Sequence, residues 1–287
     1  MPRVSVLMAA YNAEQHIGEA IESVLRQTFT DWELVIVDDG STDATAALVR
    51  TCDDPRVRLH RLAKNSGLVA ALNTGLSLCR APLVARFDAD DRCLPGRLAA
   101  QVARMEAEPA LGLLGASAIE IDRSGVATGT RTSPGGPEVV DRLRWRNAVV
   151  HPAAMFRRSV AESVGGYQAK AGRYEDYDLW LRIGAVAGID NVIEPLLEYR
   201  VHAGQVTARR TFAWQAALTI GRSRLAFARA RRESVVAAMA RHAIWVGWQI
   251  RREVRIGKLV RLRPVAARRS VASGGAIAGA RTIGRGV

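Results

Sequence analysis

Two periodicities of apolar and polar positions alternate along the first hundred residues. Short apolar runs predict strands, and the segments between them carry apolar residues three and four positions apart, as helices do. The expected strands are Val4–Ala10, 32–37, 57–62 and 83–87, and the expected helices are 14–27, 42–50, Leu68–Leu78 and one that begins at Pro95. Such alternation implies crossover connections, so we expect an α/β fold with a mainly parallel central sheet flanked by helices.

Beyond residue 110 the pattern is less regular. The segments that we expect to be extended are Leu111–Ile121, 149–156 and 189–200, and those that we expect to be helical are 137–146, one that begins at Glu175 and much of the chain from Phe212 onward. The last segment, 271–287, is rich in Gly, Ala and Arg and poor in large apolar residues, so we expect it to be disordered.

Charge divides the chain into two parts. The formal net charge is +13, but residues 209–287 hold 18 Lys and Arg against two acidic residues, or +16, which leaves −3 for residues 1–208. We therefore expect a boundary near residue 208, with one nearly neutral unit at 1–208. A basic, amphipathic helical extension is expected at 209–270.

The composition is that of a globular protein, with 48% hydrophobic and 24% charged residues. Three widely spaced cysteines, without a C-x-x-C pair, are expected to be buried or half-buried thiols in a reducing, cytoplasmic compartment. The apolar run after Met1 is too short for a secretory signal, and there is no uncharged apolar run of 18 residues, so we expect no membrane-spanning helix.

Polar residues that suit a nucleotide follow three of the expected strands. Tyr11 follows the first, Asp38 and Asp39 the second, and Asp88, Asp90 and Asp91 the fourth. Ligands of open α/β sheets bind at the carboxyl ends of parallel strands, so these residues are expected at one edge of the sheet.

The acidic cluster has two interpretations. Carboxylates as close as Asp88 and Asp90 repel one another unless a cation compensates them, and Mg²⁺ or Mn²⁺ uses one or two carboxylates together with phosphate oxygens. The alternative is an Asp-rich turn that caps the next helix. Phosphate-binding glycine loops, zinc-binding H-E-x-x-H and the nucleophile elbow are absent from the sequence, which favours a metal as the partner of nucleotide phosphates.

Asp39 and Tyr11 are weaker signals when taken alone. An Asp-Gly-Ser turn is common loop chemistry, although Asp39 has oxygens that suit the edge of a nucleobase. Tyr11 offers a ring that suits stacking on a base, but a tyrosine after a strand is also often half-buried.

Longer motifs resemble those of family 2 glycosyltransferases with the GT-A fold. The half that binds the nucleotide sugar is matched by VSVLMAAYNAEQHIGEAIESVLRQTF, WELVIVDDGSTDAT, NSGLVAALNTGL and LVARFDADD, and the acceptor half by VVHPAAMFRRSVAESVGGY, YEDYDLWLR and EYRVH. The resemblance covers residues 3–207 and leaves the basic extension outside it. It implies a GT-A glycosyltransferase domain at 1–208, with a nucleotide-sugar half at about 1–110 and an acceptor half at about 111–208.

The resemblance implies roles for individual residues. The implied nucleotide-sugar-binding residues are Ala10, Tyr11, Asp39, Asn65, Asp88 and Asp90, and the implied metal ligands are Asp88, Asp90 and His202. Asp176 is the implied general base, and His202 is expected to close over the diphosphate. Many family members carry Arg before the Asn of the third motif, where this chain has Leu72 before Asn73, so phosphate binding is expected to depend on the metal or on another base such as Lys64.

These residues predict an inverting, metal-dependent transferase that moves a sugar from a nucleotide diphosphate to an acceptor hydroxyl, in the biosynthesis of a surface polysaccharide or glycolipid. Asp176 would take the acceptor's proton, and a divalent metal (Mn²⁺ or Mg²⁺) would offset the charge of the leaving diphosphate. Two alternatives stay open: a nucleotidyltransferase that makes nucleotide sugars, and a non-catalytic nucleotide- or carbohydrate-binding relative.

The extension also has more than one interpretation. Trp and aliphatic residues interleaved with Arg, as in 243–252, predict a helix that lies on an anionic membrane surface, which would place the protein at the inner face of the cell membrane near a lipid-linked acceptor. The alternative is a helix docked on the domain with its arginines in solvent. Basicity alone is weak evidence for nucleic-acid binding, and no such partner is expected.

Overall fold

Residues 1–201 and 213–261 are described in a computed structural model of the chain, and for 253–261 only the course of the helix is described. His202 lies outside the described residues. So do 209–212 and 262–270 of the expected extension and the expected tail at 271–287.

Helices and strands alternate regularly at first and less regularly after β4. The elements are β1 (Val4–Ala10), α1 (Ile17–Leu25), β2 (Trp32–Asp38), α2 (Thr45–Arg50), β3 (Val57–Arg61), α3 (Leu68–Leu78), β4 (Leu83–Asp88), β5 (Arg92–Cys93), α4 (Arg97–Ala107), β6 (Leu111–Ile121), β7 (Ala127–Arg131), α5 (Pro137–Leu143), the 3₁₀ helix η1 (His151–Ala153), β8 (Met155–Arg157), α6 (Arg158–Ser163), the 3₁₀ helix η2 (Ala169–Tyr174), α7 (Glu175–Gly184), β9 (Gly188–Arg200), α8 (Trp214–Ala230) and α9 (Val235–Arg261).

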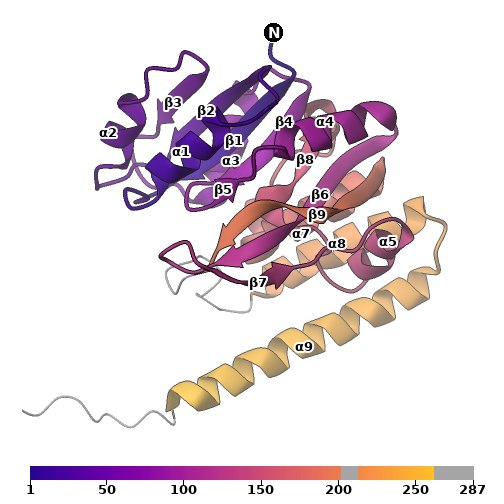
Figure 1. The fold of residues 1–287 in the computed structure, drawn as a ribbon. Helices are drawn as coiled ribbons and strands as arrows, with labels where there is room; N and C mark the ends of the chain where they lie inside the picture. The colour runs from indigo at the N-terminus through magenta and orange to yellow at the C-terminus, as the bar shows by residue number, and fades with distance from the viewer. Residues whose placement is uncertain (202–212, 262–287) are drawn as a thin grey trace, which may run out of the picture.

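The strands of the described residues form one mixed sheet, flanked by helices (Figure 1). Its order is β3-β2-β1-β4-β8-β6-β9-β5, and β7 pairs with β6. β1 to β4 are parallel, as is the β6–β9 pair, whereas β8, β5 and β7 pair antiparallel to their neighbours. The expected α/β class is confirmed, and the fully parallel region is the half built by the first four strands.

Apolar side chains of β1 alternate between the two faces of the sheet, as the pleat of a strand requires. Val6 and Met8 belong to the apolar cluster that includes Ile17 of α1. Leu7 belongs to the cluster on the opposite face, with Leu72 of α3. Because both faces of β1 are covered, the strand is buried along its length, and only its carboxyl end is near solvent.

The expectation for residues 149–156 was wrong in part. The segment forms η1 at His151–Ala153 and reaches the sheet only at β8, which begins at Met155. Pro152 has no N–H for a strand ladder and suits the first turn of a helix, so the apolar run around it folds as a buried turn. α6 and β7 were not expected from the pattern at all.

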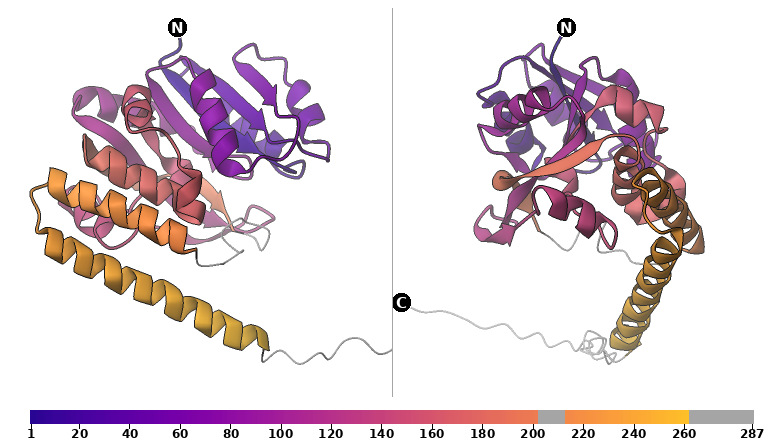
Figure 2. Two further views of the ribbon diagram at one scale, coloured as in Figure 1. Left: turned by 180° about the vertical axis from the view of Figure 1, so that it is seen from behind. Right: turned by 90° about the vertical axis from the view of Figure 1, so that its right-hand side faces the viewer.

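The helical C-terminal extension is confirmed over the described residues, and its first helix is docked on the domain. α8 packs against α7 and η2 with Ile220 and Phe227 fully buried, and the Ser223 hydroxyl donates to Asp178 Oδ1 at 2.6 Å. Figure 2 shows α9 running alongside α8 as the outermost layer of the molecule and extending past it. None of the described helices has the length and apolarity needed to cross a membrane.

Candidate functional site

The carboxyl ends of β1, β2 and β4 lie at one edge of the sheet, as expected. The strand register pairs Ala10 with Asp38, and Ala9 with Asp88. Ala10 is buried, whereas Tyr11 beyond it is 47% exposed. The next residue, Asn12, takes a left-handed conformation with φ of 50°. The chain therefore turns sharply here and leaves the Tyr11 ring available to a ligand.

Asp39 holds the loop before α3 against the end of β2. Its two carboxylate oxygens accept hydrogen bonds from the Ser66 and Gly67 N–H groups at 2.7 and 2.8 Å. Gly40 has φ of +69°, and a Cβ there would lie 2.6 Å from the Lys64 carbonyl carbon, so no other residue fits this approach. A nucleobase at this position would share the Asp39 carboxylate with two backbone donors.

Asn65 and Lys64 occupy the same loop and are both exposed. The Asn65 side-chain oxygen accepts from the Gly67 N–H at 3.2 Å, so the residue stabilises the turn that it was expected to use for ligand binding. Leu72, in contrast, is fully buried in the core cluster of α3. Position 72 therefore offers no cation for a phosphate group, and the exposed Lys64 is the basic residue of this loop that could contact one.

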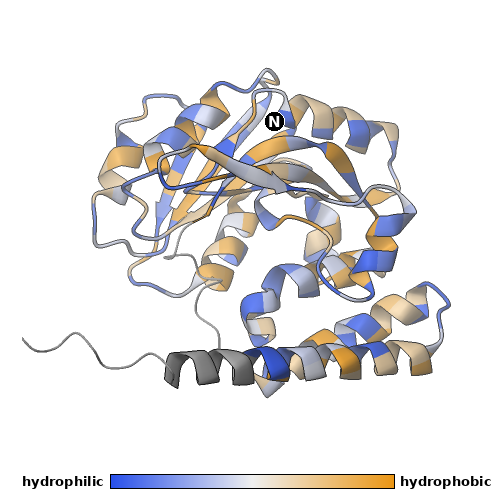
Figure 3. Cartoon of the chain, turned by 60° about the horizontal axis from the view of Figure 1, so that its bottom comes forward, coloured by the Kyte–Doolittle hydropathy of each residue, from blue (hydrophilic) through white to orange (hydrophobic). Residues whose placement is uncertain are grey.

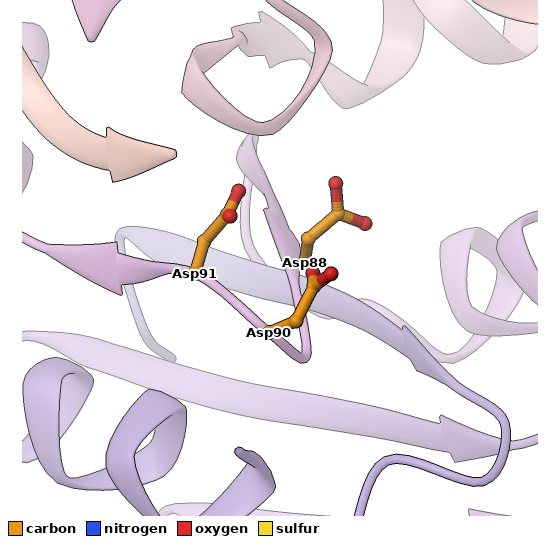
Figure 4. A group of neighbouring side chains, drawn as sticks. All are labelled: Asp88, Asp90 and Asp91. Carbon is orange, nitrogen blue, oxygen red and sulfur yellow. The ribbon is translucent and has the colours of Figure 1, made fainter. Parts of the chain in front are cut away.

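Asp88, Asp90 and Asp91 stand at the turn between β4 and β5, and their side chains project to the same side (Figure 4). One oxygen of each carboxylate lies within 4.8 Å of the others. Burial raises the pKa of Asp88 despite the neighbouring Arg86, and burial with the charges of Asp88 and Asp90 raises the pKa of Asp91 well above its ordinary range. The neighbouring Arg86 therefore does not fully offset the effects of burial and of mutual repulsion on the carboxylates of this turn.

This donor set fits a divalent cation. Three clustered carboxylates supply the hard oxygen ligands that Mg²⁺ or Mn²⁺ prefers. Asp91 is 1% exposed, and its Oδ2 has no hydrogen-bond partner among the described residues, while its Oδ1 accepts from the Arg200 N–H at 2.8 Å. An added positive charge would relieve the repulsion that raises these pKa values.

Arg86 is a buried cation between the two acidic groups of the site. Its guanidinium forms an ion pair with Asp88, and its side chain is 3% exposed. The same charge acts on Glu175 and Asp176 at the start of α7. An arginine inside an otherwise apolar strand, two residues before Asp88 and on the same face, is the feature of the sequence that indicates this buried counter-ion.

Glu175 and Asp176 form a second acidic pair at the first turn of α7. The Asp176 carboxylate accepts hydrogen bonds from Asn147 Nδ2 and from the Tyr177 N–H, both at 2.6 Å. Burial raises the pKa of Asp176 to about 6, and burial together with the charge of Asp176 raises that of Glu175 to about 8. Burial and the neighbouring charge therefore make these carboxylates stronger proton acceptors than ordinary ones, which suits a general base.

His151 and Tyr167 extend the buried polar group around Arg86. His151 Nε2 lies 3.0 Å from the Tyr167 hydroxyl. Burial and the charge of Arg86 hold the pKa of His151 well below its usual range, so the imidazole is neutral. Asn73 fixes the Tyr167 backbone with two hydrogen bonds of 2.9 Å. Asn73, the asparagine of the third motif, thus contributes to the site indirectly, because it holds the backbone of Tyr167.

The structure brings most of the expected residues into one site. Ala10, Tyr11 and Asp39 share an edge with Asp88 and Asp90, and Arg86 links that edge electrostatically to Asp176. His202 lies outside the described residues. Asn147 was missed, because nothing about an asparagine in an Arg-rich loop indicates that it will meet a carboxylate 29 residues away.

Comparisons with known proteins find glycosyltransferases. The family model for Glycosyl transferase family 2 matches residues 5–165. The amylovoran biosynthesis glycosyltransferase AmsE of Erwinia amylovora is 35% identical over 211 residues, which cover 72% of this chain and 79% of the relative. The UDP-Glc:alpha-D-GlcNAc-diphosphoundecaprenol beta-1,3-glucosyltransferase WfaP of Escherichia coli is 31% identical over 213 residues, which cover 73% of this chain and 82% of the relative.

Solved structures share the fold at low sequence identity. TarS of S. aureus in complex with UDP-GlcNAc has a TM-score of 0.67 at 18% identity, covering 86% of this chain and 72% of that one. The mannosyltransferase PcManGT of Pyrobaculum calidifontis, in complex with GDP-Man and Mn²⁺, has a TM-score of 0.58 at 21% identity, covering 92% of this chain and 76% of that one.

Proposed function

The chain belongs to glycosyl transferase family 2, and we propose that it transfers a sugar with inversion from a metal-bound nucleotide sugar to an acceptor hydroxyl. A role in the biosynthesis of a surface polysaccharide or glycolipid is supported by the names of two relatives, one for amylovoran biosynthesis and one for a diphosphoundecaprenol-linked acceptor. The mechanism rests on one observation: the buried cation Arg86 interacts with two acidic groups. It forms an ion pair with Asp88 of the cluster that also holds Asp90 and Asp91, and its charge acts on Asp176.

Residues at the edge of the sheet would bind the nucleotide sugar. Tyr11 is exposed for stacking on the base, above buried Ala10, and Asp39 would accept from the base edge beside the loop of Asn65. Asp88 and Asp90 would hold a divalent metal, which when bound neutralises the charge of the leaving diphosphate. His202 stays part of this proposal as a further ligand that closes over the diphosphate.

Asp176 would accept the proton of the acceptor hydroxyl as that oxygen attacks the anomeric carbon. The Asn147 amide orients one carboxylate oxygen, and a pKa of about 6 keeps the group ionised at neutral pH while it remains a useful base. A single base and a single displacement invert the anomeric configuration without a covalent intermediate. Glu175 is the next candidate for the base, and burial together with the charge of Asp176 raises its pKa to about 8.

A screen of nucleotide sugars with Mn²⁺ and acceptor extracts tests the proposal. A transferase releases nucleoside diphosphate only with its own sugar, and NMR of the product gives the anomeric configuration. Exchange of pyrophosphate instead would indicate a nucleotidyltransferase, and neither reaction with any sugar would indicate a binding protein. Retention of configuration would contradict the single displacement.

For the acceptor we propose a lipid-linked glycan at an anionic membrane surface. The relative WfaP is named for a diphosphoundecaprenol-linked acceptor. α9 carries an outer apolar stripe at helical spacing, with Val236, Met239 and Ile250 exposed by 77%, 58% and 39%. Residues 209–287 add a charge of +16. Apolar and polar residues are mixed along α9 (Figure 3), as in helices that lie on membranes rather than cross them.

Vesicle co-sedimentation of the full chain tests this surface. The double variant Val236→Ser, Met239→Ser is expected to bind anionic vesicles less, and salt to weaken binding of the wild type, because basic residues near an anionic surface contribute about 1 kcal/mol each before screening. Leu48→Ser, on α2 far from α9, is the matched control. Equal binding to neutral and anionic vesicles would contradict the electrostatic part.

The proposed halves at about 1–110 and 111–208 would divide binding of the nucleotide sugar from binding of the acceptor. The helical extension is not tested cleanly by truncation at 208, because removal of α8 would take away the buried Ile220 and Phe227 and uncover the surface of α7 and η2 against which α8 packs. Point variants on the outer stripe of α9 leave that packing in place. If the stripe binds the membrane, the protein lies at the inner face of the cell membrane, as the sequence predicted.

A further inference from the structure

The inner face of α9 contacts two segments that flank the proposed base. Trp245 is 4% exposed, and it lies against the ring of Tyr174, with centroids 5.0 Å apart in an edge-to-face arrangement. Gln249, one turn further along, also reaches Tyr174. Trp248 stacks on Trp145 at 6.3 Å. The α9 residues of these contacts lie outside the region that resembles the family, whereas Tyr174 and Trp145 lie inside it.

Gln249 acts on Tyr174 through its side-chain oxygen. The Tyr174 hydroxyl donates to Gln249 Oε1 at 2.8 Å, and Arg173 Nη2 approaches the same oxygen at 3.5 Å. Arg173 Nη2 also donates to the Tyr174 hydroxyl at 2.7 Å. One acceptor atom on α9 therefore holds the last two residues of η2.

Tyr174 is the residue from which α7 starts, directly before Glu175 and Asp176. The preceding 3₁₀ segment is interrupted at Gly172, where φ is +60°. A short, kinked segment of this kind has few hydrogen bonds of its own and depends on outside contacts for its position. The orientation of the first turn of α7, and of Asp176 on it, thus depends on what holds Tyr174.

The second flanking segment holds the other side of the Asp176 carboxylate. Asn147, which donates to Asp176, lies two residues after Trp145. The Trp145 carbonyl accepts from Arg224 Nη2 of α8 at 2.7 Å, while its ring stacks on Trp248 of α9. The two C-terminal helices therefore brace both the carboxylate and the amide that orients it.

We propose that Gln249 is a positioning residue for the general base, and that α9 is in this way part of the active site. The inference rests on the proposed role of Asp176. Gln249 lies 75 residues after Tyr174 and does not touch the substrate in this proposal. It acts by holding the start of α7 where Asp176 meets the acceptor hydroxyl.

The first test compares Gln249→Leu with Gln249→Glu in the full chain. The leucine removes the acceptor oxygen, and a displaced base lowers kcat by about tenfold, given that misplacements near 1 Å cost up to about 100-fold. The KM for the nucleotide sugar is expected to stay within about twofold, because the edge that binds it is not contacted. The glutamate keeps the acceptor oxygen and is expected to retain most of the activity.

A double-mutant cycle identifies the contact that matters. Tyr174→Phe removes the hydroxyl partner and is expected to lower kcat as Gln249→Leu does, and the double variant is expected to lose no more than either. Ile244→Ala, a 44% exposed residue on the same helix, is the matched control. Circular dichroism melting of each variant separates misfolding from misplacement.

Four outcomes overturn the inference: wild-type kcat in Gln249→Leu, equal losses in Gln249→Leu and Gln249→Glu, additive losses in the double variant, or a loss of the same size in Ile244→Ala. Asp176→Asn is measured in parallel. If it keeps wild-type turnover, the proposed base is wrong. If it loses turnover while Gln249→Leu does not, only the positioning role is wrong.

Discussion

The Asp-rich turn after β4 and the first turn of α7 both present buried or half-buried carboxylates, but the partners that hold them come from different distances along the chain. Asp88, Asp90 and Asp91 share a turn, and their counter-ion Arg86 is two residues away on the same strand. Asp176 takes its amide partner from residue 147, and the residue that begins its helix is held from residue 249.

This difference explains why the sequence predicts the position of the Asp-rich turn but does not predict the partners of Asp176. Strand ends that share an orientation meet at one edge whatever the rest of the chain does. A carboxylate in the first turn of a helix, in contrast, is common because it interacts favourably with the helix dipole. The role of Asp176 can therefore be inferred only from the residues that surround it in the folded protein. The following experiments separate the two regions, from the largest expected effect to the smallest.

Asp176→Asn is expected to have the largest effect. Turnover should fall by roughly 10²–10⁴-fold, the usual scale for loss of a general base. Binding of the nucleotide sugar, measured by calorimetry with Mn²⁺, should be unchanged because the metal turn is intact. Glu175→Gln is the matched control, and it is expected to keep far more activity. If the two variants lost activity equally, the base could not be assigned to Asp176.

Asp90→Ala is expected to impair metal binding at the Asp-rich turn. Affinity for the nucleotide sugar should fall by at least roughly 10–100-fold, the scale seen when even outer partners of metal ligands are removed. Excess chelator should have the same effect on the wild type and little further effect on the variant. Full affinity in chelator would contradict metal binding at this turn.

Arg86→Gln is expected to disturb both regions at once. With a pKa of about 6, Asp176 loses its function as pH falls, so wild-type kcat should drop below about pH 6 and approach a tenfold loss per pH unit. Removal of the cation raises that pKa, so the acid limb should move to higher pH, whereas Arg86→Lys should keep it in place. An unmoved limb in Arg86→Gln, measured on folded protein, would refute the electrostatic link.

The smallest expected effect is on stability. The pKa values of Glu175 and Asp176 are raised by burial, so the unfolded chain releases these protons first as pH rises. Stability from this pair is thus complete below the unfolded values near 4 and is lost as pH rises through about 6 to 8. Urea unfolding of Asp176→Asn should show a gain of the order of 2 kcal/mol at pH 8 and little at pH 4. A gain of equal size at both values would point to a cause other than charge.

Much of the fold followed from local pattern. The limits of β1, α3 and β6 agree with those expected, since a buried apolar run or a helical period is a property of neighbouring residues. The segment 149–156 shows where this fails, because an apolar run does not distinguish a strand from the buried turn that Pro152 imposes. The helical character of the extension could also be predicted from its local pattern, but that pattern did not predict which of its faces is buried.

The sequence by itself determined the edge of the sheet, because parallel strands carry Ala10, Asp39, Asp88 and Asp90 to the same place through their order and direction alone. Only the tertiary structure decided that Asn147 meets Asp176, that Arg86 lies between two acidic groups, and that Gln249 holds Tyr174. The reason is physical. A local pattern reports which face of an element is apolar, whereas a contact between buried polar side chains depends on how distant elements pack, and no periodicity in either segment encodes its partner.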